Sequence, residues 1–294
     1  MIRHSGRVHM PPLVGASGWL NSEPLTAAEL RGRVVLVNFW TWTCINWLRQ
    51  EPYVRAWAGA YRDEGLVVIG VHTPEFSFEH DVEGVRRTTE EREIDYPVAV
   101  DNDYKVWSAF ANHYWPALYF IDAEGVIRAQ HFGEGRHEKS ERVIQRLLGV
   151  ERELVSVEGT GVEAEADWDN LRTPETYLGY AGGRQLASLT GDWTTGPENI
   201  TLNRPGGSIS FRFHARDAHL VLSPAAREPI PFRVLLDGEA PGPSHGLDID
   251  EHGNGLLAEG RLYQLIRQHD AIRERTLEIT FREPGAQAYA FTFG

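Results

Sequence analysis

Residues 35–47 read VLVNFWTWTCINW and contain Cys44, the only cysteine of the 294-residue chain. The run VVLVNFW at 34–40 consists of β-branched and aromatic residues around one asparagine, which is typical of a strand buried on both faces. Residues 45–62 have helix-forming composition, with Pro52 inside the segment. The sequence therefore predicts that Cys44 lies where a buried strand ends and a helix begins.

A thiol at such a junction would lie beside the unsatisfied backbone N–H groups of the helix start and the positive end of the helix dipole. Both of these favour the thiolate. Cysteines in this setting titrate between about 3.5 and about 7.5, against about 8.5 for an unperturbed thiol. Cys44 is therefore the candidate nucleophile, and the alternative from residue type alone is a buried, inert cysteine.

Strand and helix signals alternate around this segment. Apolar runs predict further strands at 66–71, 95–100, 117–121 and 126–132, and mixed-charge or amphipathic runs predict helices at 78–92, 104–110 and 139–148. The turn sequence DAEG at 122–125 should join the last two strands as an antiparallel hairpin. The alternation predicts an α/β domain with a largely parallel sheet.

The C-terminal part of the chain has a different pattern. Periodicity is lost over 151–174, where the sequence is acidic and contains glycines. Short alternating runs between Gly, Pro, Asp and Asn turns then predict strands at 208–213, 219–222, 232–236, 262–266, 277–281 and 289–293. We therefore expect an α/β domain at 12–150, a linker at 151–172 and an all-β jelly-roll or sandwich domain at 173–294.

Composition limits the partners and the location. The net charge is −13, from 42 acidic and 29 basic residues with no basic run, which argues against nucleic acid as a partner. No stretch approaches 18 apolar residues, and residues 1–10 lead into no apolar core, so neither a membrane span nor a signal peptide is expected. We expect a cytoplasmic protein if Met1 is the native start, and an extracytoplasmic one if the chain was cut from a longer precursor.

Four sequence motifs occur together in the first domain: NFW before Cys44, HTPEF at 72–76, DNDY at 101–104 and HYWPA at 113–117. Together they resemble the thioredoxin superfamily, in its TlpA-like and DipZ-like branch of redoxins, over roughly residues 13–148. The resemblance implies a thioredoxin-like fold and thiol-disulfide oxidoreductase chemistry. Its partners would be protein or low-molecular-weight thiols and disulfides, and no cofactor or metal is expected.

The resemblance also assigns roles to individual residues. Cys44 matches the nucleophile, and Pro116 matches the family's cis-proline, which lies against the reactive sulfur in the same substrate-facing loop as Trp115. Asn38 occupies the strand position that holds a buried acid in thioredoxin itself. Glu75 is a candidate for the acidic residue near the thiol in TlpA-like proteins, and the alternative is an exposed loop carboxylate.

Trp47 is the departure from the family pattern, since it stands where the family has its second, resolving cysteine. An internal disulfide cannot form, so the usual dithiol cycle cannot be completed within this chain. Cys44 could form a mixed disulfide that an external thiol resolves, be oxidised by peroxide to a sulfenic acid, or trap partners without turnover. Trp47 itself is expected to be a packing residue rather than a substrate contact.

Three neighbouring side chains are candidates for supporting the thiol. Thr41 stands three residues before Cys44, as in peroxiredoxins, where a threonine hydroxyl helps to position peroxide; the alternative is a hydrogen bond to the turn backbone. Arg49 and His72 could each stabilise a thiolate from within about 4–6 Å. Lone Arg and His residues are more often structural or solvated.

The second domain resembles the carbohydrate-binding-module-like β-sandwich that follows the thioredoxin domain in DipZ-type proteins. Carbohydrate is therefore a possible partner, with five aromatic residues as candidate platforms and strand packing as the alternative: Trp168, Tyr177, Tyr180, Trp193 and Tyr263. The segment DIDEHGNG at 248–255 has oxygen ligands at alternating positions, which would suit either Ca²⁺ or a tight polar turn.

The leading hypothesis is a single-cysteine thiol-disulfide oxidoreductase that acts through Cys44 with an external resolving thiol. One alternative is a one-cysteine peroxide reductase. The other is a non-catalytic protein- or carbohydrate-binding protein in which Cys44 is dispensable.

Overall fold

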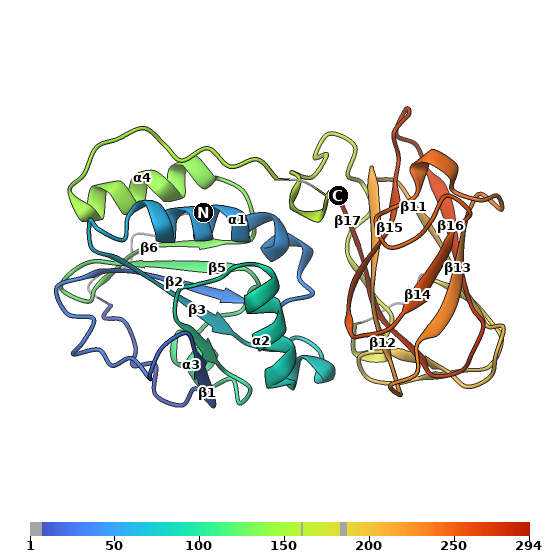
Figure 1. Cartoon of the computed structure of the whole chain (residues 1–294), viewed down its shortest axis with the longest axis horizontal. Helices are drawn as coiled ribbons and strands as arrows, with labels where there is room; N and C mark the ends of the chain where they lie inside the picture. Colours follow the sequence, from blue (N-terminus) through green and yellow to red (C-terminus); the bar gives the residue numbers. More distant parts are fainter. Residues whose placement is uncertain (1–7, 160, 183–186) are drawn as a thin grey trace. The chain divides into compact units, whose positions relative to one another are not determined.

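The computed structural model describes residues 8–159, 161–182 and 187–294, so part of the N-terminal segment considered above lies outside the described residues. The chain divides into two compact units, with the boundary between Glu163 and Ala164. The first unit combines helices with a mixed sheet, and the second is built almost entirely of strands (Figure 1).

A six-stranded sheet forms the centre of the first unit, in the order β1-β4-β3-β2-β5-β6. The three middle strands β2, β3 and β4 are parallel, and β5 and β6 form the expected antiparallel hairpin. The edge strand β1 was not predicted, because its residues Gly-Trp-Leu begin with a glycine and include no β-branched residue. The strands are β1 (Gly18–Leu20), β2 (Val34–Trp40), β3 (Leu66–His72), β4 (Val98–Val100), β5 (Ala117–Ile121) and β6 (Ile127–Phe132).

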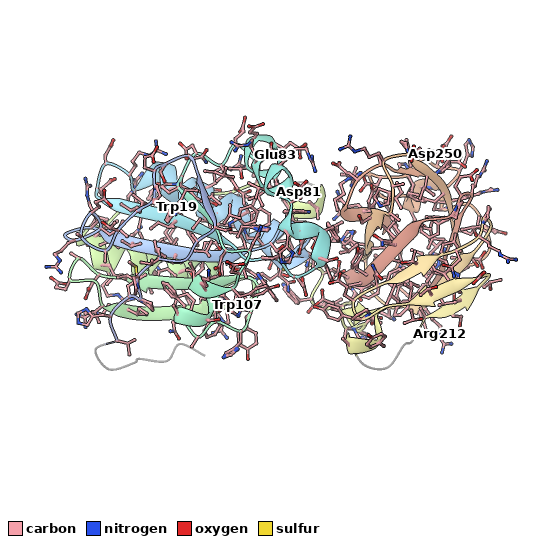
Figure 2. The ribbon with its side chains drawn as sticks, turned by 90° about the horizontal axis from the view of Figure 1, so that it is seen from below. Trp19, Asp81, Glu83, Trp107, Arg212 and Asp250 are labelled. Atoms are coloured by element: carbon pink, nitrogen blue, oxygen red, sulfur yellow. The ribbon has the colours of Figure 1, made fainter. Side chains whose placement is uncertain are left out.

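The helices of this unit are α1 (Ile45–Ala60), α2 (Val82–Glu91), α3 (Lys105–Ala109) and α4 (His137–Leu148), with a short 3₁₀ helix η1 (Ser77–His80) before α2. Figure 1 shows α1 and α4 together across one face of the sheet and α3 on the other side. The single helix expected at 78–92 is divided at Asp81, which caps α2 by accepting the Glu83 N–H at 3.2 Å (Figure 2).

Every residue of the central strand β2 is buried, which agrees with the prediction of a strand covered on both faces. Val37 and Phe39 contribute to the core shared with α3. On the opposite face Trp40 stacks on Trp47 of α1, with ring centroids 4.3 Å apart and 17° between the planes. This aromatic pair packs α1 against the sheet three residues after Cys44.

A buried carboxylate joins α1 to α4. Glu141 accepts hydrogen bonds from Trp57 Nε1 at 3.0 Å, from the Tyr61 hydroxyl and from the Val155 N–H at 2.8 Å. These contacts satisfy a group that would otherwise be costly to bury. They also tie the segment after α4 to the helical layer.

The second unit consists of two antiparallel sheets, in the orders β15-β12-β17-β10-β9 (with β7 beside β17) and β14-β13-β16-β11-β8. Both sheets contribute to one apolar core, so the expected all-β sandwich is confirmed. Its strands are β7 (Thr176–Tyr177), β8 (Ser188–Thr190), β9 (Trp193–Thr195), β10 (Ile200–Leu202), β11 (Ser208–Phe213), β12 (Asp217–Pro224), β13 (Ile230–Leu236), β14 (Asn254–Leu257), β15 (Arg261–Arg267), β16 (Arg275–Phe281) and β17 (Ala286–Phe293). Short 3₁₀ helices lie at η2 (Gly161–Glu163) in the first unit and at η3 (Tyr180–Gly182) and η4 (Gly242–Ser244) in the second.

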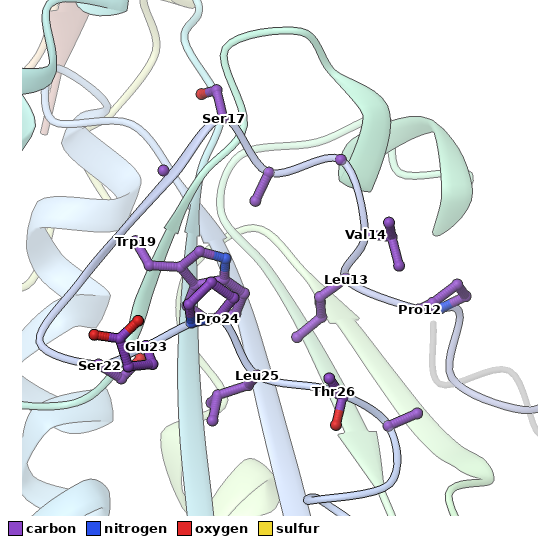
Figure 3. Close-up of a pocket in the computed structure, with 14 residues that line it drawn as sticks. Pro12, Leu13, Val14, Ser17, Trp19, Ser22, Glu23, Pro24, Leu25 and Thr26 are labelled. Atoms are coloured by element: carbon purple, nitrogen blue, oxygen red, sulfur yellow. The ribbon is translucent and has the colours of Figure 1, made fainter.

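A pocket of about 630 Å³ lies around β1, lined by residues 12–19 and 22–27. Figure 3 shows Leu13, Trp19, Pro24 and Leu25 among its apolar lining. None of the residues assigned to the thiol site lines this pocket. It therefore belongs to the edge of the sheet and not to the site of Cys44.

Candidate functional site

Cys44 is the N-cap residue of α1, four residues after the end of β2. Its carbonyl accepts the first helical hydrogen bond, from Leu48 N at 3.0 Å, and its N–H donates to the Thr41 carbonyl at 3.3 Å. Its side chain is partly exposed, and no acidic residue occurs in the first turn of α1. The thiol therefore lies where the sequence predicted it, accessible and beside the positive end of a helix.

The Trp115–Pro116 peptide bond is cis, as the resemblance implied. Ala117, the first residue of β5, pairs with Phe39 near the end of β2, so Pro116 lies at the sheet edge from which Cys44 follows. Trp115 is partly exposed, and its Nε1 donates to the Thr73 carbonyl at 2.9 Å. The proline loop and the thiol therefore share one end of the sheet.

Trp47 is fully buried against Trp40, and the Arg92 guanidinium lies 5.5 Å from the centroid of its ring. This burial confirms that Trp47 is a packing residue. A substrate bound at Cys44 therefore has no access to the side chain that replaces the resolving thiol.

Thr41 is also fully buried. Its hydroxyl lies 3.5 Å from His72 Nε2, within the protein interior. Because the hydroxyl is engaged inside the protein, it is not exposed to position peroxide at the thiol. The Thr41 carbonyl accepts the hydrogen bond from the Cys44 N–H that closes the turn.

The two basic candidates have structural partners. His72 is enclosed between Trp40 and Trp42, and burial, with a smaller contribution from His80, lowers its pKa to about 3, so it is neutral near pH 7. Arg49 is buried and forms a 3.0 Å ion pair with Glu134. Glu134 follows Gly133, whose N–H donates to the Pro116 carbonyl. Arg49 therefore joins α1 to the loop beside Pro116.

Asn38 is fully buried in β2, on the same face of the strand as Trp40. It places an uncharged amide where thioredoxin has an acid. Glu75 is partly exposed in the loop after β3, and its backbone N–H donates to Glu79 Oε2 at 2.7 Å. The carboxylate that contacts the turn before Cys44 is that of Glu79.

Sequence reasoning missed Glu79, which is fully buried on η1. Its Oε1 accepts the Thr43 hydroxyl at 2.7 Å and the Thr43 N–H at 3.3 Å, and its Oε2 accepts the N–H groups of Glu75 and Phe76. Burial raises the pKa of Glu79, while these donors oppose the rise. The only sequence signal was an acid between aromatic residues after a strand.

A second buried acid, Glu51, lies on α1 seven residues after Cys44 and was also missed. Burial raises its pKa to about 7, against the opposing charges of Arg55 and Arg92. The guanidinium groups lie 3.4 and 3.8 Å from its carboxylate oxygens. Glu51 therefore titrates near neutrality inside the helical layer.

The aromatic residues considered as sugar platforms in the second unit do not share one environment. Tyr263 is fully buried, and Trp193 is partly buried, donates to the Thr190 carbonyl and packs edge-on against Phe281. Tyr177 is partly buried in β7. Trp168 and Tyr180 are 53% and 65% exposed.

The segment at 248–255 uses its carboxylates internally. Asp248 accepts from Arg261 and from the Gln264 N–H, and Asp250, labelled in Figure 2, accepts the N–H groups of His252 and Asn254. This geometry favours the polar-turn interpretation. Among residues 8–159, 161–182 and 187–294, no group of three or more His, Cys, Asp or Glu side chains is arranged to hold a metal ion. Within the same residues, no helix is both long and apolar enough to cross a membrane.

A partly exposed thiol at a helix start after a central parallel strand, with a cis-proline at the same sheet edge, defines a thioredoxin-like site. Residues 16–130 match the AhpC/TSA family, and residues 183–294 match the thioredoxin like C-terminal domain. The chain is 33% identical to thiol-disulfide oxidoreductase YkuV of Bacillus subtilis, over 48% of this chain and 95% of that protein. The chain belongs to the thioredoxin-like redoxin family.

Protein DipZ of Mycobacterium bovis is similar to both units, with 33% identity over 97% of this chain. The chain spans 42% of the length of that protein. Among solved structures, a thioredoxin-like protein in its oxidized form is 33% identical and is covered over 98% of its length, with a TM-score of 0.46 and 49% of this chain matched.

Proposed function

We propose that the chain is a single-cysteine thiol-disulfide oxidoreductase that works through Cys44 and an external resolving thiol. The observation that carries the proposal is the position of Cys44, partly exposed at the start of α1 and at the same sheet edge as Pro116, with Trp47 buried three residues later. The relative YkuV, which is named as a thiol-disulfide oxidoreductase, supports the same chemistry.

The reaction is an exchange of sulfur partners. The Cys44 thiolate attacks one sulfur of a substrate disulfide, a bond forms between the two sulfurs, and the other substrate sulfur leaves as a thiolate. Because these 294 residues contain no second cysteine, the mixed disulfide is attacked by a thiolate from outside them. That attack on the substrate sulfur regenerates the Cys44 thiolate and leaves a new disulfide between the substrate and the attacking thiol.

The substrates are expected to be disulfides of proteins or of small molecules, and the resolving thiol is expected to come from the same two classes. The test is to mix the reduced protein with oxidised glutathione and with a disulfide-bonded peptide, and to follow the mixed disulfide by intact mass. We expect a one-to-one adduct that forms faster than with an unstructured cysteine peptide and disappears on addition of reduced glutathione. Cys44→Ser should form no adduct, and a wild-type rate equal to that of the unstructured peptide would contradict the proposal.

A further inference from the structure

We propose that Glu79 is a positioning residue. Its carboxylate keeps the turn before Cys44 in a fixed position relative to the loop that contains Trp115 and Pro116. The inference rests on the proposed function of Cys44. Glu79 lies on η1, outside the segment that carries the thiol, and its carboxylate is fully buried. Each of its two oxygens holds a different segment of the site.

The first oxygen holds the turn before the thiol. Oε1 accepts both the hydroxyl and the N–H of Thr43, at 2.7 and 3.3 Å, and Thr43 is 1% exposed. Because Thr43 and Cys44 share a peptide bond, a displacement of Thr43 would move the thiol and the start of α1 together.

The second oxygen holds the loop after β3. Oε2 accepts the N–H groups of Glu75 and Phe76, at 2.7 and 2.9 Å. The same loop starts at Thr73, whose N–H donates to the Trp40 carbonyl at 3.0 Å and whose carbonyl accepts Trp115 Nε1 at 2.9 Å. One carboxylate therefore connects the turn of Cys44 to the residue that precedes the cis-proline.

The chemistry of these contacts makes a carboxylate difficult to replace. All of its donors are neutral N–H or O–H groups that approach two separate oxygens. A glutamine has the same size but only one acceptor oxygen. Its NH₂ group would face the N–H or O–H donors that now bind the second carboxylate oxygen, and two donors cannot form a hydrogen bond with each other. Glu79→Gln should therefore loosen one of the two segments without leaving a cavity.

The readout compares two reactions of Cys44. A disulfide-bonded peptide must meet both the thiol and the proline loop, whereas iodoacetamide needs only the thiolate. Because a misplacement of about 1 Å can cost about 100-fold in rate, we expect Glu79→Gln to lower the peptide exchange rate at least about tenfold. The rate of iodoacetamide alkylation, followed across pH 5–9, should change by less than about threefold, since alkylation does not depend on that alignment.

Glu141→Gln is the matched control. Glu141 is another buried carboxylate of the first unit with several donors, and its partners lie on α1, near the end of that helix, and after α4. The control should lose thermal stability as Glu79→Gln does and should keep both rates. If Glu79→Gln does not fold, Thr43→Val can be used, because it removes only the hydroxyl donor. It should lose peptide exchange and keep alkylation, whereas Thr43→Ser retains the hydroxyl and should exchange at the wild-type rate.

The inference is overturned if folded Glu79→Gln exchanges with the peptide at the wild-type rate, or if Glu141→Gln loses as much exchange as Glu79→Gln. It is also overturned if Thr43→Ser exchanges as slowly as Thr43→Val. A wild-type protein that exchanges no faster than an unstructured cysteine peptide would instead refute the proposed function on which the inference rests.

Discussion

Replacing Trp47 with cysteine should give the site an internal resolving thiol. Residues three apart at a helix start are neighbours, and a disulfide needs Cβ atoms about 3.5–4.5 Å apart. Trp47 lies three residues after Cys44 and on the buried side of α1. We therefore expect Trp47→Cys to convert single-thiol chemistry into dithiol chemistry.

The substitution has a predictable cost in stability. The Trp47 side chain is fully buried and stacked on Trp40, and truncation of a buried tryptophan to alanine costs about 3–5 kcal/mol. The slightly larger cysteine should fall near the lower end, about 3 kcal/mol. Because a domain is stable by about 5–15 kcal/mol, the variant should fold at low temperature, where the assay is run.

The assay uses one equivalent of an aromatic disulfide that releases a coloured thiolate, such as 5,5′-dithiobis(2-nitrobenzoate), so that no reduced Cys44 of a second molecule remains to attack the mixed disulfide. In the wild-type protein Cys44 should release one thiolate per molecule of reagent and retain the other half as a mixed disulfide. In Trp47→Cys the introduced thiol should attack that mixed disulfide and release the second thiolate. The expected yields are therefore one and two thiolates per reagent molecule.

Trp47→Ala is the control, since it creates a comparable cavity without a thiol and should release one thiolate. The reasoning is refuted if folded Trp47→Cys also releases only one thiolate per reagent molecule. Such a result would mean that the position of Trp47 does not face the sulfur of Cys44.

Three further outcomes follow from the buried polar groups. Burial raises the pKa of Glu51 from 4.5 to about 7, so its stabilising contribution is complete below pH 4.5 and is lost as the pH rises through 7. Urea denaturation should show Glu51→Gln gaining up to about 3 kcal/mol over wild type at pH 8 and less than about 1 kcal/mol at pH 5. An equal difference at both values would contradict this. Arg49→Ala leaves the buried Glu134 carboxylate without its ion-pair partner and should lower the free energy of unfolding by about 3 kcal/mol. The double variant with Glu134→Ala should lose less stability than the sum of the two single variants, and strict additivity would argue against the ion pair. Because the Thr41 hydroxyl is buried, peroxide should oxidise the Cys44 thiolate no faster than the thiolate of an unstructured cysteine, once each rate is corrected for its ionised fraction. Thr41→Val should leave that rate unchanged, whereas fast, saturable sulfenylation would favour a peroxidase.

The parts of the site that could be predicted from the sequence are those defined by local pattern. The apolar run at 34–40 fixes β2, and the change of composition after Cys44 fixes the start of α1. The cis bond before Pro116 came from a family motif and is confirmed. Each of these depends on neighbouring residues in the chain or on a recognisable short segment.

The parts that could not be predicted depend on packing between distant segments. Glu75 and Glu79 are four residues apart in similar sequence, and only the fold shows that Glu79 is fully buried while Glu75 is partly exposed. The partner of Arg49 lies 85 residues further along the chain. Burial and long-range pairing of charges have no periodic signature, so sequence patterns could not identify these contacts.

Two differences from the thioredoxin pattern each replace a titratable buried side chain with one that does not titrate. Trp47 removes the buried thiol, and Asn38 places a neutral amide on the strand face that also carries Trp40, the stacking partner of Trp47. A buried acid on this face would have no neighbouring thiol to deprotonate, yet it would still cost free energy to ionise. His72 is neutral as well, and Arg49 is paired with Glu134. These four side chains behind Cys44 therefore serve packing and ion pairing, and under the proposed single-cysteine function the second thiol would reach Cys44 on its exposed side.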